Sequence, residues 1–170
     1  AAMEHLLLGG IAREASILTQ LRRTFPGVVD VHLPRGGTCR YHLVVKLRKR
    51  WEGEPVNVIM GALAAHADIK HVVVVDEDVD IYDSVSVEWA VATRFQAARD
   101  TVIVSGGQGS KLDPSADDGL SDKMGLDATM PVDRQGLDYT RVYVPGQDDS
   151  SLDRWIDATV DAAALERLAD

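Results

Sequence analysis

One stretch of the chain is apolar without any alternation: His71-Val72-Val73-Val74-Val75. A strand that carries apolar side chains on both faces is covered on both faces, which is typical of parallel strands in an α/β sheet. Apolar residues at helical spacing lie before this stretch, over 56–67, and after it, over 84–98. The stretch therefore predicts the central strand of a sheet that is flanked by helices.

The amino-terminal part of the chain extends this pattern. Apolar residues at helical spacing predict a helix over 10–25, which Pro26-Gly27 ends. Further strands are expected at 28–33, 41–47 and 101–104. Strand 71–75, the helix after it and strand 101–104 have the short connections of a βαβ unit. The predicted fold class is α/β, with a compact, mostly parallel sheet flanked by helices.

After Ser105 the pattern changes. Residues 106–119 are rich in Gly, Asp and Ser, and no hydrophobic period is present through Gly136. A stretch of about 30 residues without regular structure is commonly a functional or partner-contacting loop. A short strand over 139–144 and an amphipathic helix from Ser151 to the end are expected after it. We therefore expect an α/β domain over 1–145 and a helix for packing or oligomerisation within 146–170.

Composition excludes several classes of partner. Eighteen basic and 27 acidic residues give a net charge of −9, which argues against binding to nucleic acid or to an anionic membrane. The basic run Lys46–Arg50 is interpreted as a solvated strand end. No apolar run reaches the ~18–20 residues of a membrane span. The single cysteine, Cys39, allows no internal disulfide and is expected to be buried, which fits a cytoplasmic protein.

Two polar features are candidates for a site. The acidic run Asp76–Asp80 follows the buried strand, where α/β folds often bind metals, but it also suits a turn before a helix that Asp83 or Ser84 caps. We favour the turn. Lys123 stands among acidic neighbours and either faces a phosphate or carboxylate, or balances Asp122 and Asp127 at the surface. Composition alone favours the surface alternative.

Five segments, read in order, resemble the UbiD-like family of decarboxylases and carboxylases that use prenylated flavin mononucleotide (FMN). They are Phe25–Pro34, Val72–Asp80, Val87–Arg94, Leu112–Ser115 and Lys123–Thr129. The resemblance extends from residue 9 to residue 129 and corresponds to the carboxy-terminal third of a typical member. This chain is therefore expected to be the carboxy-terminal domain of such an enzyme, as a fragment or as a subunit.

The resemblance implies that catalysis depends on residues outside this chain. In the family, a central domain holds the prenylated FMN with a divalent metal, Mn²⁺, and a monovalent cation, and an arginine with two glutamates does the acid–base work. The Pro-Phe-Gly-Glu-like stretch that carries the glutamates is not found in this sequence. We therefore expect no catalytic residue and no metal ligand here, and no activity of the chain alone.

The resemblance also implies roles for residues of this chain. Lys123 matches the family lysine that reaches the flavin phosphate, while Leu126 and Thr129, on the same loop, are expected near the substrate. The implied reaction is reversible, non-oxidative decarboxylation of an aromatic or α,β-unsaturated acid. The domain would close over the cofactor and supply contacts for a homo-oligomer, with the missing cofactor-binding part as its partner.

Two alternatives stay open. The chain could be a non-catalytic oligomerisation module, because helix 56–67 is rich in small residues and the terminal helix carries Trp155 and Ile156. It could also be an autonomous enzyme that uses Asp76–Asp80 with Mg²⁺ or Mn²⁺.

Overall fold

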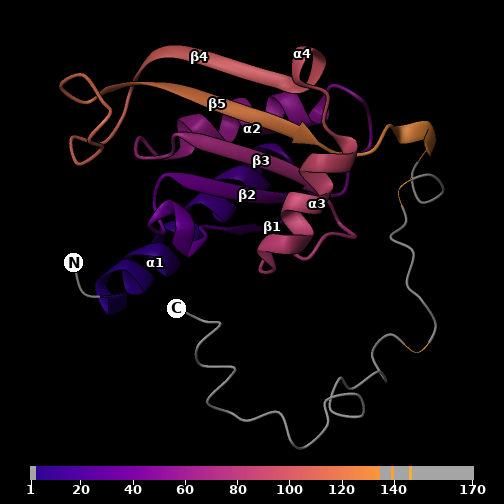
Figure 1. The fold of residues 1–170 in the computed structure, drawn as a ribbon, viewed down its shortest axis with the longest axis horizontal. Coiled ribbons are helices and arrows are strands. Elements are labelled where there is room, and N and C mark those ends of the chain that lie inside the picture. Colours follow the sequence, from indigo (N-terminus) through magenta and orange to yellow (C-terminus); the bar gives the residue numbers. More distant parts are fainter. Residues whose placement is uncertain (1–2, 135–138, 140–145, 147–170) are drawn as a thin grey trace, which may run out of the picture. The chain divides into compact units, whose positions relative to one another are not determined.

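The computed structural model describes residues 3–134, 139 and 146. A five-stranded sheet has the order β1-β2-β3-β5-β4 (Figure 1). Its strands are β1 (Val28–His32), β2 (His42–Leu47), β3 (His71–Asp76), β4 (Thr101–Gln108) and β5 (Leu120–Ala128). The three central strands, β2, β3 and β5, are parallel, and β1 and β4 are antiparallel at the two edges. The expected α/β class, with a parallel centre flanked by helices, is confirmed.

Helices cover both faces of the sheet (Figure 1). They are α1 (Met3–Thr24), α2 (Glu54–Ala65), α3 (Ser84–Arg94) and the single turn α4 (Ala97–Asp100), with short 3-10 turns at Arg35–Gly37 and Val132–Arg134. Helices α1 and α2 share one hydrophobic core with the sheet, and α3 shares a second core with the opposite face. The sheet is therefore the middle of three layers.

Strand β3 shows why its sequence is apolar throughout. Val72 and Val74 belong to the core beneath α1 and α2, whereas Val73 and Val75 belong to the core beneath α3. All four valines are at most 3% exposed. Burial of one such side chain contributes about 1.5–3 kcal/mol, so this strand anchors both layers.

The expectation of one irregular loop after Ser105 is wrong for its second half. Strand β4 continues to Gln108, and β5 returns antiparallel to it over Leu120–Ala128. The reason lies at Gly125, where a Cβ atom would lie 2.1 Å from Cγ2 of Ile59 on α2. The helix packs directly on the strand backbone at Gly125, and the alternate positions on either side are the polar residues Ser121, Lys123 and Asp127, so β5 lacks the apolar run that marks β3.

The predicted βαβ unit is also wrong. Strand β4 does not lie parallel to β3, because β5 is inserted between them and β4 pairs antiparallel with β5. The βαβ arrangement instead comprises β2, α2 and β3, two parallel neighbours joined through a helix.

Other expectations have mixed outcomes. Cys39 is buried at 4% exposure, as expected. The strand predicted over 139–144 and the helix predicted within 146–170 lie outside the described residues. Within the part of the chain that the structure describes, no helix has the length and apolar character of a membrane span.

Candidate functional site

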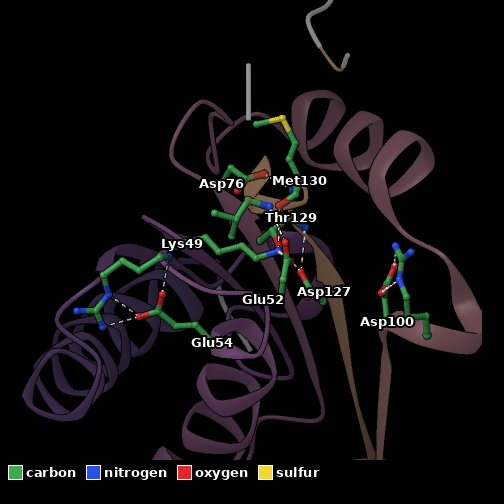
Figure 2. Close-up of polar contacts among 11 residues, drawn as sticks. Lys49, Glu52, Glu54, Asp76, Asp100, Asp127, Thr129 and Met130 are labelled. Atoms are coloured by element: carbon green, nitrogen blue, oxygen red, sulfur yellow. Dashed lines mark hydrogen bonds and ion pairs between the residues drawn. The ribbon is translucent and has the colours of Figure 1, made fainter. Parts of the chain in front are cut away.

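Charged and polar side chains gather at the carboxyl ends of the parallel strands (Figure 2). Lys49 follows β2, Asp76 ends β3, and Asp127 and Thr129 lie where β5 ends. Parallel strands end at the same edge of a sheet, and open α/β sheets bind ligands outside that edge. This edge is the first part of the candidate site.

The acidic run after β3 is bound to an arginine. Nη1 of Arg94 donates to Oδ2 of Asp76 at 2.7 Å, and both Nη atoms donate to the carboxylate of Asp78 at 2.8–3.0 Å. Only 1% of the Arg94 side chain is exposed. Burial raises the pKa of Asp76, whereas the hydrogen bonds from Arg94 lower the pKa of Asp78.

The remainder of this run makes a turn into α3. Asp83 caps the helix, since its carboxylate accepts hydrogen bonds from the backbone N–H groups of Val85 and Ser86. The turn interpretation is therefore confirmed. Among the described residues, no group of three or more His, Cys, Asp or Glu side chains is placed to hold a metal ion.

Lys49 is buried, which contradicts the expectation of a solvated strand end. Its side chain is 3% exposed, and its Nζ donates to the carbonyl of Met130 at 2.9 Å and pairs with Glu52 at 2.6 Å. These partners offset the cost of removing the ammonium from water. The sequence could not reveal this, since Met130 lies 81 residues away.

Thr129 lines a polar cavity of about 420 Å³ at the carboxyl edge. Its neighbour Asp127 accepts hydrogen bonds from the Thr129 backbone N–H at 3.0 Å and from its hydroxyl at 2.6 Å. Burial raises the pKa of Asp127. Other residues that line the cavity are Lys49, Glu52, Gly53, Val56, Arg99, Asp100 and Pro131.

Lys123 lies nearer the amino end of β5, beside a largely apolar cavity of about 460 Å³. The residue is 5% exposed, and its Nζ donates to the carbonyl of Ala67 at 2.9 Å. Burial lowers the pKa of Lys123. In the described part of the chain it forms no ion pair with Asp122 or Asp127, so the alternative of a surface lysine that balances them is wrong.

Lys123 is the charged residue among the side chains that line this cavity, which are otherwise mostly apolar. The Lys123 ammonium has three N–H donors, of which the carbonyl of Ala67 uses one. A buried cation with spare donors and a cavity beside it is suited to an anionic group. The resemblance implies a divalent metal beside the cofactor. Among the described residues, no cluster of His, Cys, Asp and Glu side chains is placed to hold it.

The structure only partly brings the three predicted site residues together. Lys123 and Leu126 are on strand β5 and Thr129 follows its end, so the expectation that they share a loop is wrong. Lys123 and Thr129 lie toward α2, where the contact of Gly125 with Ile59 stands between their cavities. Leu126 lines an apolar cavity of about 590 Å³ beside α3. Their ligand roles stay predictions.

Comparison with known proteins decides the family. The family model described as the 3-octaprenyl-4-hydroxybenzoate carboxy-lyase C-terminal domain matches residues 6–128. The chain belongs to this family. The UbiD-like resemblance of its sequence is thereby confirmed.

Several curated relatives are decarboxylases by name. Anhydromevalonate phosphate decarboxylase of Aeropyrum pernix is 51% identical over 145 residues, which are 85% of this chain and 33% of the relative. Gallate decarboxylase of Lactiplantibacillus plantarum is 36% identical over 144 residues, covering 76% of this chain and 29% of the relative. The UbiD-family chain thus spans about a third of the length of these curated relatives.

Solved structures of the UbiD class share the fold. The enzyme HmfF from Pelotomaculum thermopropionicum, solved with FMN, superposes with a TM-score of 0.81 at 51% identity, covering 90% of this chain and 34% of HmfF. The 3,4-dihydroxybenzoic acid decarboxylase AroY of Klebsiella pneumoniae gives a TM-score of 0.76 at 27% identity, covering 93% of this chain and 34% of AroY.

Proposed function

We propose that this chain is the carboxy-terminal α/β domain of a decarboxylase that acts on an aromatic or α,β-unsaturated acid with prenylated FMN. The observation that carries the proposal is Lys123, a buried lysine with spare hydrogen-bond donors beside a cavity. Family membership and the names of the relatives support the reaction class. The relatives include an anhydromevalonate phosphate decarboxylase and a gallate decarboxylase.

The family resemblance implies how the roles are divided between this chain and the rest of the enzyme. Most of the cofactor, with Mn²⁺ and a monovalent cation, would be bound by the part of the enzyme outside this chain, which also supplies the catalytic arginine and glutamates. When bound, the prenylated flavin supplies an electron sink for loss of CO₂. Lys123 would donate hydrogen bonds to its phosphate, and the domain would close over the site.

Substrate contacts are proposed for two further residues. Thr129 would face the substrate from the polar cavity at the carboxyl edge, and Leu126 would do so through the apolar cavity beside α3. The chain alone is expected to be inactive, and the complete enzyme is expected to be a cytoplasmic homo-oligomer.

Lys123→Met in the complete protein tests the proposal. Loss of a charge-assisted hydrogen bond costs about 1.5–3 kcal/mol, so flavin affinity should fall about 10- to 100-fold. Lys111→Met is the matched control, because Lys111 is an exposed lysine on the neighbouring hairpin loop. Flavin content, measured by absorbance after purification, should fall for the first variant and not for the second. Equal flavin content in both would contradict the role of Lys123.

The second candidate function is a non-catalytic oligomerisation module. Strand β4 is at the edge of the sheet, and the apolar side chains of Ile103 and Val104 on it are 69% and 38% exposed. Native mass spectrometry with a flavin spectrum distinguishes the candidates. A colourless homo-oligomer of this chain alone favours the module, and a larger assembly with modified flavin favours the decarboxylase.

A further inference from the structure

The segment that leaves β5 is held by side chains rather than by a neighbouring strand. The last pairing of β5 with β3 joins Ala128 to Val75. Beyond it, the backbone N–H groups of Thr129 and Met130 donate to Asp127 and Asp76, respectively. The path of this segment therefore depends on individual carboxylates.

Met130 is held on both sides of its Cα atom. Its N–H donates to Oδ2 of Asp76 at 2.7 Å, and its carbonyl accepts from Nζ of Lys49 at 2.9 Å (Figure 2). The two side chains come from different strands of the sheet, since Asp76 ends β3 and Lys49 follows β2. Two peptide groups of one short segment are thus fixed to the rigid part of the fold.

Both holding groups are charged and buried. Asp76 is 5% exposed and Lys49 is 8% exposed. Each is compensated, Asp76 by Arg94 at 2.7 Å and Lys49 by Glu52 at 2.6 Å. Hydrogen bonds to charged groups are shorter and about twice as strong as neutral ones. A buried ion pair is weak evidence for stability, so we infer that the value of this arrangement lies in fixing one geometry.

We propose that Asp76 and Lys49 are positioning residues of the decarboxylase. By fixing the peptide groups on either side of Met130, they set the path of the segment Thr129–Met130 where it leaves β5 beside the polar cavity on the carboxyl edge. The inference rests on the proposed function, in which Thr129 faces the substrate. Neither Asp76 nor Lys49 needs to touch the substrate for this role.

Two variants separate positioning from anchoring of Arg94. Asp76→Ala removes the acceptor of the Met130 N–H and one partner of Arg94. Asp78→Ala removes the other carboxylate partner of Arg94, with its two hydrogen bonds, and leaves Met130 bound to Asp76. Asp76→Asn keeps an oxygen that can accept from Met130 and serves as the conservative rescue. Lys49→Met, of similar length and apolar, tests the carbonyl side.

The measurements use the complete protein. Hydrogen–deuterium exchange of a peptide spanning 127–132 should increase at least fivefold in Asp76→Ala and Lys49→Met and stay within twofold in Asp78→Ala and Asp76→Asn. Displacement of a site residue by about 1 Å can lower the rate about 100-fold. We therefore expect kcat to fall about 10- to 100-fold in Asp76→Ala and in Lys49→Met. Bound flavin should be unchanged in all four variants, since Lys123 is retained.

Several results would overturn the inference. These are unchanged exchange in Asp76→Ala, a kcat within twofold of wild type despite faster exchange, or equal losses in Asp78→Ala and Asp76→Ala. Should Asp76→Ala not fold, Lys49→Met alone decides by the same criteria. Failure of the proposed function would give a different result. The complete wild-type protein would then carry no flavin and decarboxylate no acid. The exchange measurements would still report whether Asp76 and Lys49 hold the segment at Met130.

Discussion

Arg94, the last residue of α3, lies with its Nη1 atom 2.7 Å from Oδ2 of Asp76, the last residue of β3. The Arg94 side chain is 1% exposed and that of Asp76 is 7% exposed. The pair ties the helix on one face of the sheet to the strand at its centre. It also leaves Asp76 in place to accept the hydrogen bond from Met130.

Arg94→Met should strongly destabilise the fold. Removal of one partner of a buried ion pair leaves the other uncompensated, which costs about 3–5 kcal/mol. Urea denaturation of the purified chain measures the free energy of unfolding. Arg48→Met is the control, because the side chains of Arg48 and its partner Glu77 are 69% and 51% exposed, and an exposed pair contributes about 0–1 kcal/mol. A loss below about 1 kcal/mol for Arg94→Met would contradict the expectation.

Gly125→Ala should destabilise the contact between β5 and α2. The added Cβ would lie 2.1 Å from Cγ2 of Ile59, and overpacking of this kind costs about 1–3 kcal/mol. Ile59→Ala should rescue part of the loss, so thermal melts of the two single variants and the double variant should not be additive. Gly53→Ala is the control, since nothing lies within 4 Å of its added Cβ.

Asp113 should titrate at unusually low pH. The hydrogen bond from Lys70 is the main cause, followed by those from Ser115, and together they lower the pKa of Asp113 from 3.8 to about 2. Because the folded-state pKa is below the unfolded one, the contribution to stability is complete above pH 3.8 and is lost as the pH falls toward 2. A ¹³C titration of the carboxyl group measures this directly.

Lys70→Met is the matched test for Asp113. Its Nζ lies 2.7 Å from Oδ2 of Asp113, so the substitution should raise the pKa of Asp113 toward its ordinary value. Lys111→Met removes a lysine from the loop that carries Asp113 and keeps the contact between Lys70 and Asp113. It should leave the titration of Asp113 unchanged. An unchanged titration in Lys70→Met would show that Ser115 and the backbone control the carboxylate instead.

The candidate site could be predicted only in part. Lys123 and Thr129 are candidates through segments that resemble a family, and their ligand roles stay predictions. Lys49 could not be found in this way. The Lys49 ammonium is bound by the carbonyl of Met130, which lies 81 residues away in the sequence. Sequence patterns do not reveal which charged side chains become buried with such distant partners.

The sequence by itself determined the features that depend on near neighbours. The valines of β3, the cap at Asp83 and the helical spacing of α2 each follow from periodicity or from a local hydrogen bond. The family also follows from the sequence, because its segments keep their order along the chain.

Only the tertiary structure decided the features that depend on distant contacts. It placed β5 between β3 and β4, where β5 pairs parallel with β3 and antiparallel with β4. It also put Lys123 and Leu126 on opposite faces of one strand, because successive side chains of a strand alternate. Burial of a charge is settled by partners that folding brings together, and this is why the ions around Met130 were visible only in three dimensions.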